Sequence, residues 1–436
     1  MTLIQEGDNV LIRMPSNNCK IVTLKSASKV NLGKFGTFNA SALIGQPFNA
    51  AYNIIANGEI ESVNPSAAME DLDEEIDEDE AAERNNSNLK DREENQKVSK
   101  EEIDKMKLEL QDGTIDAKDI IKTLVTNNSS HDQKTKFAQL KFIKRKARKY
   151  SKKFEALETT TRNLCEYYFT TKPQKTRGIR VDTLAQIMCF ANVMASSNIL
   201  VADSVGGLVV GSLLERMTQG SQGFGGKVFA MMDGDMPNFD LVNEMNLDKS
   251  VIEKTLDYLS WSRFEKGENE GITIPPPETA DPNSLLRHTK KVAAIAKTIA
   301  SRTVLQQPNH FDGLIIASQF ENLEILGKLI PYVGYSRPVV IYSQFKESLV
   351  PAYLMMRGSP DFVNAQLSET LTREYQVPVS GLGTHPFMQT SGGGGFLLTA
   401  TRVFAGDEPV AAATQAHKEK KKGSNQHVQA TKKRKL

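Results

Sequence analysis

Short apolar runs separated by turn residues fill the first 63 positions of the chain. The runs 9–14 and 19–24 flank Ser16-Asn17-Asn18, and further runs at 35–38 and 52–55 lie between glycines. Short runs bounded by turn residues predict β-strands, and two that flank a tight turn predict a hairpin. Many short strands in so few residues predict a small closed β-barrel, which would serve either nucleic-acid binding or protein contacts.

Residues 64–99 have a different composition. Nine of the eleven positions from Glu70 to Glu80 are acidic, and no aromatic residue occurs between Pro65 and Ser99. Such a segment cannot bury enough apolar surface to offset its chain entropy, so we expect a disordered linker. It would act either as a solvated spacer or as an acidic competitor of RNA for the basic region that follows.

A helical periodicity begins at Ser99 and extends over a region that we place at residues 100–157. Ser99 and Glu102 have the spacing of a capping box, which predicts a helix that ends near residue 113. A second helix is predicted from residue 116, with Ile120, Ile121, Leu124 and Val125 on one face. Between 134 and 154, apolar side chains recur at three- and four-residue steps and predict a third helix with one buried stripe. The stripe consists of Phe137, Leu140, Ile143, Ala147, Tyr150 and Phe154.

The other faces of this third helix are strongly basic. They carry Lys141, Lys144, Arg145, Lys146, Arg148, Lys149, Lys152 and Lys153. A helix that docks by one stripe and is positive elsewhere is suited to contact the phosphate backbone of RNA. The alternatives are a nuclear-import signal and a solvated helix.

From residue 158 to residue 406, buried strands alternate with helices, which predicts a Rossmann-like sheet that ends in an antiparallel hairpin. Strands are predicted at 199–202, 225–232, 312–318, 338–342, 367–377 and 396–403, and helices at 182–193 and 284–301, with 240–261 mostly helical. In the helix over 284–301, we expect Val292, Ile295 and Ile299 to face inward. The polar tail over 407–436 is predicted to be disordered.

The unit over 198–217 carries the main chemical information. A buried strand leads through Asp203 into a two-glycine turn and then into a helix. This order is typical of a nucleotide-type site at the carboxyl edge of an α/β sheet. The cofactor turn of S-adenosylmethionine-dependent methyltransferases reads acidic-x-Gly-x-Gly-x-Gly, and here Val205 and Val209 replace the first and third glycines. Because two β-branched side chains would fill the cofactor space, the unit predicts a degenerate site.

Two other strand ends bear on catalysis. Asp233 follows the second strand, where a working site would hold the cofactor ribose, and it is either a relic or a turn residue. The strand over 312–318 continues into Gln319-Phe320 and has no ionisable group at its end. A general base is therefore missing at this position.

Composition narrows the class of protein. The net charge of +1 hides the acidic and basic blocks described above. The three cysteines (Cys19, Cys165 and Cys189) have no metal-type spacing, which suits a reducing compartment and argues against disulfide and zinc sites. Because no apolar run approaches membrane-spanning length and the N-terminus is polar, we expect a soluble intracellular protein.

Several smaller features have two interpretations each. Tyr167-Tyr168-Phe169, followed by Lys172, Lys175, Arg177 and Arg180, would hold unpaired bases or belong to the core. His385 would hydrogen-bond locally or touch a ligand backbone. The glycines over 392–395 would offer N–H groups to phosphate or a partner, or would form a flexible turn. Lys432-Lys433-Arg434-Lys435 resembles a nuclear-localisation cluster.

Four separated motifs together resemble one family. They are FAQLKFIKRKARKY, TTRNLCEYYF with RVDTLAQIM, DSVGGLVVGSLLERM and HPFMQTSGGGGFLLTATRV. In this order they resemble the non-catalytic, tRNA-binding subunit of the tRNA adenine N1-methyltransferase that modifies the T-loop adenine at tRNA position 58. The resemblance extends from the N-terminal strands to Arg402.

The resemblance implies an N-terminal β-barrel and a C-terminal Rossmann-like methyltransferase domain without cofactor. It implies a homologous catalytic subunit that holds S-adenosylmethionine and the proton-abstracting aspartate, with two such pairs in a heterotetramer. It also implies action on tRNAs including initiator tRNA, and the basic cluster over 432–435 indicates a nuclear protein. A free-standing RNA methyltransferase and an RNA-binding scaffold of translation initiation are the alternatives. The residues that the motifs place toward tRNA are Lys134, Lys136, Lys141, Lys144, Lys146, Thr160, Arg162, Arg177, Arg180, His385 and Arg402; no catalytic, cofactor-binding or metal residue is implied.

Overall fold

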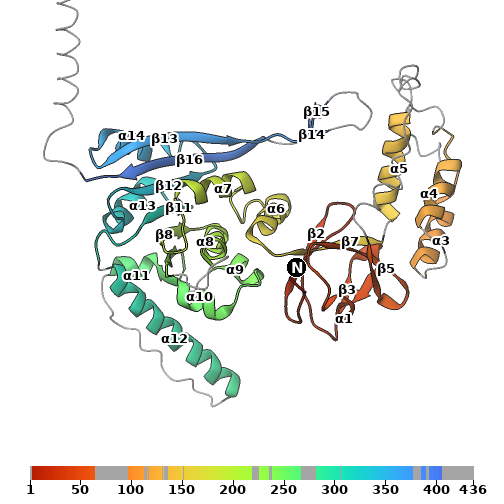
Figure 1. Ribbon diagram of the computed structural model, residues 1–436, viewed down its shortest axis with the longest axis horizontal. Helices are drawn as coiled ribbons and strands as arrows, with labels where there is room; N and C mark the ends of the chain where they lie inside the picture. The colour runs from red at the N-terminus through yellow and green to blue at the C-terminus, as the bar shows by residue number, and fades with distance from the viewer. Residues whose placement is uncertain are drawn as a thin grey trace, which may run out of the picture. The chain divides into compact units, whose positions relative to one another are not determined.

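The computed structural model of the 436-residue chain is shown in Figure 1. It describes residues 2–63, 97–111, 115, 117–129, 131, 136–150, 152–218, 225–234, 238–266, 281–305, 307–376, 384–388 and 392–404. The predicted acidic linker, except for 97–99, and the predicted tail lie outside these residues. The chain divides into two compact units. Unit 1 comprises 1–167, 244–246 and 374–390, and unit 2 comprises 168–243, 247–373 and 391–436.

Unit 1 is built around a five-stranded antiparallel sheet. Its strand order is β2 (Cys19–Thr23), β1 (Asn9–Arg13), β7 (Lys153–Glu158), β5 (Ala50–Ile54) and β6 (Ile60–Val63). A separate two-stranded ladder joins β3 (Lys29–Asn31) to β4 (Thr37–Asn39), and three short helices lie between the strands: η1 (Gly33–Phe35), α1 (Ala40–Leu43) and η2 (Ala56–Gly58). The predicted hairpin at Ser16-Asn17-Asn18 is confirmed by the pairing of β1 with β2. Among the described strands, β2 and β6 are the sheet edges, so closure into a barrel stays a prediction.

The predicted helix over 134–154 is wrong at its end. Helix α5 spans Lys136–Tyr150, and Phe154 lies in β7, between β1 and β5. There its ring stacks on Phe38 at a centroid distance of 4.7 Å and lies 5.7 Å from Tyr52. The four-residue step from Tyr150 to Phe154 matched a helix by coincidence. The backbone is extended here because β7 is the central strand of the sheet. Phe154 and Ala156 are both buried, which is the two-residue alternation of a strand.

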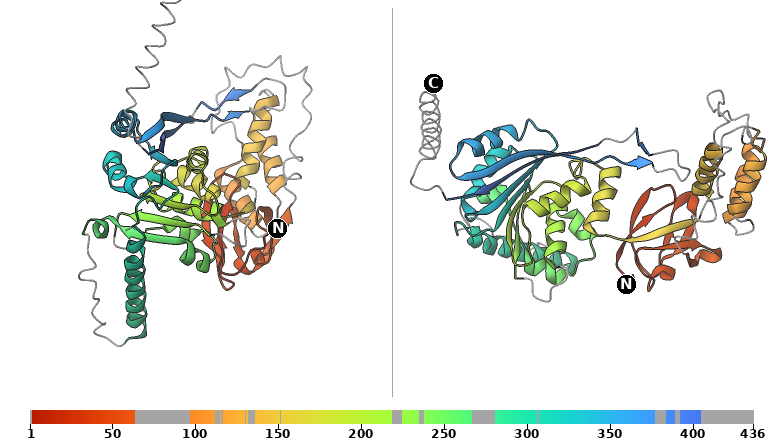
Figure 2. Two further views of the ribbon diagram at one scale, coloured as in Figure 1. Left: turned by 60° about the vertical axis from the view of Figure 1, so that its left-hand side comes forward. Right: turned by 45° about the horizontal axis from the view of Figure 1, so that its top comes forward.

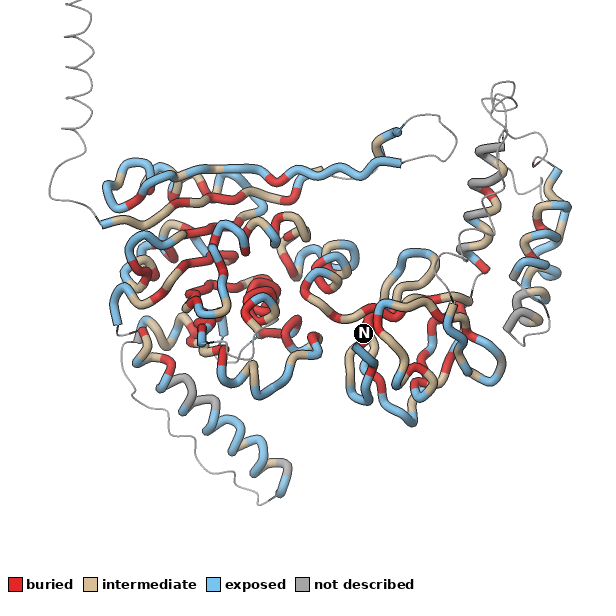
Figure 3. Tube along the Cα trace, in the orientation of Figure 1, coloured by how far each residue is buried: buried red, intermediate tan, exposed pale blue. Residues whose placement is uncertain are grey.

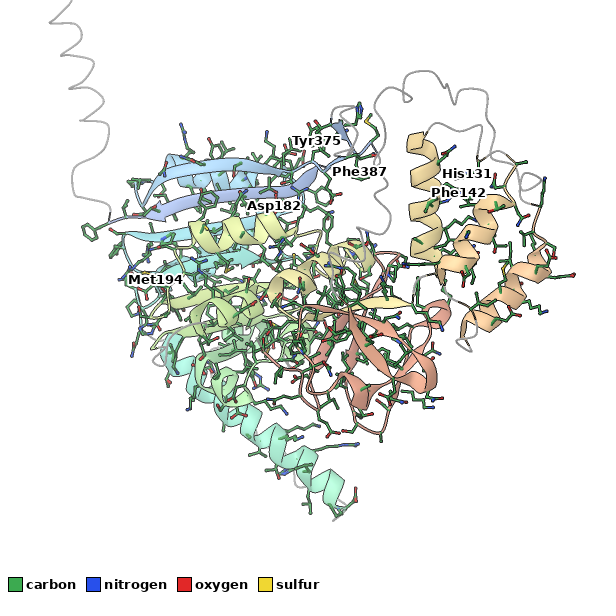
Figure 4. All side chains as sticks on the ribbon, turned by 45° about the vertical axis from the view of Figure 1, so that its right-hand side comes forward. His131, Phe142, Asp182, Met194, Tyr375 and Phe387 are labelled. Carbon is green, nitrogen blue, oxygen red and sulfur yellow. The ribbon has the colours of Figure 1, made fainter. Side chains whose placement is uncertain are left out.

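The remaining helices of this region agree with the sequence pattern. The capping box that starts α3 (Lys100–Gln111) is confirmed, because the Ser99 amide donates to Glu102 Oε2 at 3.0 Å and the Glu102 amide donates to Ser99 Oγ at 3.1 Å. Helix α4 (Ala117–Thr126) buries Ile120 and Leu124 completely against Tyr150 of α5. Phe142, among the basic positions of α5, is buried with its ring 5.7 Å from that of His131 (Figure 4).

Unit 2 contains a seven-stranded sheet. The strands, in spatial order, are β10 (Leu256–Ser260), β9 (Lys227–Met232), β8 (Asn198–Asp203), β11 (Gly313–Ala317), β12 (Arg337–Ser343), β16 (Gly393–Arg402) and β13 (Phe362–Leu371). The first five are parallel, and β16 is antiparallel to both of its neighbours. The predicted Rossmann-like order with a late antiparallel hairpin is therefore confirmed.

Helices cover both faces of this sheet (Figure 2). Helices α7 (Val181–Phe190) and α8 (Leu208–Thr218) pack together against strands that include β8 and β12, whereas α13 (Asn322–Leu329) packs with α14 (Val350–Gly358) against β11 and β13. The helices α9 (Asp240–Glu244), α10 (Lys249–Thr255), α11 (Trp261–Lys266), α12 (Pro282–Leu305) and η5 (Ile330–Tyr332) complete the unit. A central strand covered on both faces must be apolar throughout, which explains the continuous buried run of β8 (Figure 3).

One expectation for unit 2 is confirmed and two are wrong. The strand predicted at 367–377 begins and ends earlier, as β13 (Phe362–Leu371). The region 240–261 is mostly helical as expected, through α9 and α10, but it also contains β10, whose five residues pair with β9 at one edge of the sheet. So short a strand carries little periodicity of its own. Val292 does not face inward: it is 45% exposed on α12, whose described residues are mostly exposed (Figure 3). Among the described side chains of this helix, Val304 and Leu305 at its C-terminal end join the core. The side chains of Ile295 and Ile299 lie outside the description. No helix among the described residues is long and apolar enough to cross a membrane.

Candidate functional site

The degenerate turn lies where β8 ends and α8 begins, and Asp203 organises it. The buried carboxylate accepts four backbone N–H bonds: Oδ1 from Val205 at 2.8 Å and Gly207 at 3.1 Å, and Oδ2 from Val209 and Val210 at 3.1 Å each. The first-turn donors of a helix have no intrahelical partner, and its N-terminus attracts negative charge. The carboxylate thus fixes the turn and the start of α8 from within the chain.

Two features of the environment of Asp203 shift the pKa of its carboxyl in opposite directions. Burial raises the pKa of the Asp203 carboxyl above its usual value, whereas the four N–H bonds act to lower it. A buried carboxylate is tolerated only where it is hydrogen-bonded. The turn and the carboxylate therefore depend on each other.

Both turn glycines are covered by another segment of the chain. Gly206 and Gly207 have φ angles of +72° and +83°, which favour glycine. A Cβ on Gly207 would lie 2.9 Å from Phe239 Cα, and one on Gly206 would lie 3.0 Å from Leu241 Cδ1. The Leu241 amide also donates to the Gly206 carbonyl at 3.1 Å. The close approach that the glycines permit is used by residues 239–241.

These residues do not fit S-adenosylmethionine in the turn. Val205 and Val209, at the positions of the first and third motif glycines, are both completely buried. A cofactor would need the space of these side chains and of the segment 239–241. The site that the strand-turn-helix unit would form is filled by the protein itself.

The strand ends next to the turn are joined by side chains. Asp233, at the end of β9, accepts from Ser204 Oγ at 3.2 Å and from Gln319 Nε2 at 3.0 Å. Ser204 Oγ lies 3.2 Å from Ser318 Oγ, and Arg177 Nη2 donates to Gln319 Oε1 at 3.0 Å. The acidic residue that would hold a ribose is thus engaged by β11, and Arg177 belongs to the same network.

Arg180, which sequence reasoning assigns to tRNA, holds internal structure together. Its guanidinium pairs with Asp182, with Nη2 2.8 Å from Oδ2, and Nη1 donates to the Gly392 carbonyl at 2.8 Å. Thr372 Oγ1 donates to the same Asp182 oxygen at 2.9 Å. This clamp ties the start of α7, where Figure 4 labels Asp182, to the hairpin of β13 and β16.

The glycine run after residue 391 has a packing role that sequence reasoning missed. Gly394 is buried in β16, where a Cβ would lie 2.4 Å from Thr370 Oγ1 and 2.6 Å from Thr183 Oγ1. A Cβ on Gly395 would lie 2.6 Å from the ring of Tyr342. Because Gly393–Gly395 belong to a strand, these three residues are not a flexible turn, whereas contact of their N–H groups with phosphate or a partner stays a prediction.

The other predicted tRNA residues occupy varied positions. Arg402 Nη1 donates to Asn309 Oδ1 at 3.0 Å and to the Ile330 carbonyl at 2.6 Å, so it holds loops of unit 2. Thr160 Oγ1 accepts from the Asn163 amide at 3.3 Å, at the start of α6 (Thr161–Thr171). Arg162 has a 75% exposed side chain and pairs with Glu166 at 3.5 Å.

His385 and the lysines complete the set. His385 is exposed in β15 (His385–Pro386), which pairs with β14 (Tyr375–Gln376); Figure 4 labels Tyr375 and the neighbouring Phe387. Lys146 Nζ lies 5.1 Å from the ring centroid of Phe142. Lys136, Lys141 and Lys144 belong to α5 with side chains outside the description, and Lys134 lies outside the described residues.

One aromatic residue of the run Tyr167-Tyr168-Phe169 belongs to the core. Tyr168 is buried and has Lys175 Nζ 4.7 Å from its ring centroid, so the core alternative holds for this aromatic. Lys175 also pairs with Asp240 at 3.0 Å.

Among the residues that the structure describes, no group of three or more His, Cys, Asp or Glu could hold a metal ion.

Comparison with known proteins gives consistent matches. The Gcd10p family matches residues 3–289. The tRNA (adenine(58)-N(1))-methyltransferase non-catalytic subunit TRM6 of Kluyveromyces lactis is 31% identical over 435 residues, covering 94% of this chain and 89% of the relative. The protein of the same name from Debaryomyces hansenii is 28% identical and covers 98% of this chain and 92% of the relative. That from Mus musculus is 27% identical and covers 92% of this chain and 88% of the relative. A SAM-dependent O-methyltransferase structure from Thermotoga maritima shares the fold, with a TM-score of 0.50 at 11% identity, covering 93% of this chain and 97% of that chain.

Replacing Asp203 by Asn tests the closure of the turn. The amide keeps one acceptor oxygen and points an NH₂ donor at N–H groups, so we expect the free energy of unfolding to fall by about 2–4 kcal/mol. Urea unfolding of the full chain measures this change. Glu347→Gln, which changes an exposed carboxylate, is the matched control and should stay within about 0.5 kcal/mol of wild type. A loss below about 1 kcal/mol for Asp203→Asn would mean that the carboxylate is not needed there.

The Arg180 clamp predicts a pH dependence of stability. The bond from Arg180, helped by Thr372, lowers the pKa of the Asp182 carboxyl below its ordinary value, although burial opposes this shift. A depressed folded-state pKa stabilises the fold fully above the unfolded value of about 3.9, and the stabilisation is lost as the pH falls through the folded pKa. We expect Asp182→Asn to melt below wild type at pH 7 and the gap to narrow below about pH 4. A gap that stays constant from pH 7 to pH 2 would contradict this role.

Proposed function

The chain belongs to the Gcd10p family, and we propose that it is the non-catalytic, tRNA-binding subunit of a tRNA (adenine(58)-N(1))-methyltransferase. The observation that carries this proposal is the filled turn after β8, in a unit that otherwise keeps the methyltransferase order of strands and helices. A fold retained without its cofactor site is suited to binding and assembly rather than to methyl transfer.

The proposal places the chemistry in a catalytic partner. S-adenosylmethionine and the base that removes the adenine proton belong to that partner, and this chain holds no cofactor. The buried Val205 and Val209 support this division, as does β11, which ends at Ala317 and is followed by Ser318, without an ionisable group. A pair of homologous folds, one active and one filled, would then share one tRNA.

Assembly and location extend the same proposal. Two catalytic and two non-catalytic chains form a heterotetramer, with the N-terminal sheet closed as a barrel. The complex acts in the nucleus on tRNAs that include initiator tRNA. The basic cluster Lys432-Lys433-Arg434-Lys435 supports nuclear import, and the basic helix α5 supports contact with the phosphate backbone.

The decisive assay compares this chain alone, the catalytic subunit alone and the pair. We expect transfer of labelled methyl groups to tRNA only with the pair, and no retention of labelled S-adenosylmethionine by this chain in equilibrium dialysis. Activity or cofactor binding by this chain alone would reject the proposal in favour of a free-standing methyltransferase. Unaltered tRNA modification without this chain would instead favour a separate scaffold role.

The basic helix makes a second prediction. Lys144→Ala combined with Lys146→Ala should weaken tRNA binding by the complex, because each lost phosphate contact removes about 0.7–0.9 from the slope of log affinity against log salt. Filter binding at several salt concentrations measures affinity and slope together. Lys25→Ala combined with Lys29→Ala, two exposed lysines of unit 1, is the control of equal charge change. Equal slopes for the two double variants would mean that α5 does not contact tRNA.

A further inference from the structure

One tripeptide occurs twice in unit 2, at equivalent places. Ser318-Gln319-Phe320 follows β11, and Ser343-Gln344-Phe345 begins at the last residue of β12. The two strands are parallel neighbours, and Ile316 pairs with Ile341. The offset of residue numbers between Ile316 and Ile341 is the same as that between Phe320 and Phe345.

The two tripeptides have the same local hydrogen bond. The Phe320 amide donates to Ser318 Oγ at 3.2 Å, and the Phe345 amide donates to Ser343 Oγ at 3.2 Å. A serine that binds the amide two residues later fixes a tight turn. Because the turns match, both aromatic side chains leave the carboxyl edge of the sheet from the same kind of backbone.

Both phenylalanines are exposed, although most large apolar side chains among the described residues are buried or partly buried. Phe320 is 48% exposed and Phe345 is 64% exposed. Both rings leave the same carboxyl edge of the sheet, after the neighbouring strands β11 and β12, so together they offer aromatic faces on that edge. An exposed aromatic pair on two fixed turns is typical of a binding surface rather than of a core.

The turns are held in place from two sides. Gln319 accepts from Arg177 Nη2 at 3.0 Å, and Gln344 Nε2 lies 3.4 Å from where a Cβ on Gly178 would be, so the loop over 177–178 contacts both glutamines. The buried Asn322 donates from Nδ2 to the Ser348 carbonyl at 3.3 Å, which links the segments after the two turns. The rings therefore stand on a preorganised base.

We propose that Phe320 and Phe345 form a stacking platform for an unpaired nucleobase of the RNA substrate. In open α/β sheets, ligands bind outside the carboxyl ends of the strands, and here the half of that edge near β8 is filled. The half near β11 and β12 offers aromatic faces, beside which stand amide side chains and the guanidinium of Arg177. Single-stranded RNA is recognised by this combination of stacking rings, amides and cations.

The proposal rests on the proposed function, because it takes tRNA as the ligand. A protein partner is the competing occupant of an exposed aromatic pair. The guanidinium of Arg177 near the rings favours RNA, since aromatic faces beside a cation suit an unpaired base and its phosphate. Leucine distinguishes the two, because it keeps an apolar contact but cannot stack as a ring does.

The test uses the complex with the catalytic subunit and tRNA. We expect Phe320→Leu combined with Phe345→Leu to lower tRNA affinity at least fivefold, in the range of about 5- to 100-fold for loss of base stacking, and Phe320→Trp combined with Phe345→Trp to restore it. Phe404→Leu is the matched control, since Phe404 is 69% exposed and follows Arg402, which pairs with Arg337 at the opposite edge of the sheet. This control should bind as wild type does.

A direct readout uses the isolated full chain, whose single tryptophan is Trp261. With Trp261→Phe as background, Phe320→Trp should show emission quenched by tRNA, and Phe404→Trp should not. If the leucine pair binds tRNA as tightly as wild type, or if it instead loses the catalytic subunit in gel filtration, the platform is not a base site, while the proposed function stands. If the wild-type complex binds no tRNA, both proposals fall.

Discussion

The four hydrogen bonds to the Asp203 carboxylate are the constraint on which the centre of unit 2 depends. They satisfy the start of α8 from within the chain and hold the turn in a conformation in which Val205 and Val209 are buried. Once the turn is closed in this way, residues 239–241 can pack directly on the two glycines. The strand-turn-helix unit thus persists as a folding element without needing a ligand to complete it.

The half of the carboxyl edge near β8 is filled by the protein itself. The half near β11 and β12 is therefore the part that can contact a ligand. Side chains of Ser204, Asp233 and Gln319 join β8, β9 and β11, and this joining gives the edge a fixed geometry. The exposed rings of Phe320 and Phe345 stand beyond it. A non-catalytic subunit that keeps the fold can therefore use the same edge for recognition, without the reorganisation that cofactor binding and release would require.

Much of the fold could be predicted from the sequence because local patterns and tertiary structure agree. The capping box at Ser99, the run of β8 and the late hairpin are of this kind. The strand conformation of Phe154 and of β10 is not predicted from local sequence, because it depends on pairing with another strand. A few residues of sequence do not indicate which strand that partner is. The repeat at Phe320 and Phe345 was visible in the sequence, but its meaning depends on the parallel register of two strands.

Charge alone does not decide which residues contact tRNA, as Arg180 and Arg402 illustrate. Both are cations in motifs that suggest tRNA contact, which stays a prediction, and in the structure their guanidinium groups bind carbonyl and carboxylate oxygens of unit 2. An arginine has five donors and can hold a fold together as readily as it binds phosphate. Charge in a sequence therefore identifies the residues able to bind RNA, whereas exposure decides which are available. By that criterion Arg162, exposed on α6, is better placed to reach a phosphate than Arg180, whose side chain is 15% exposed.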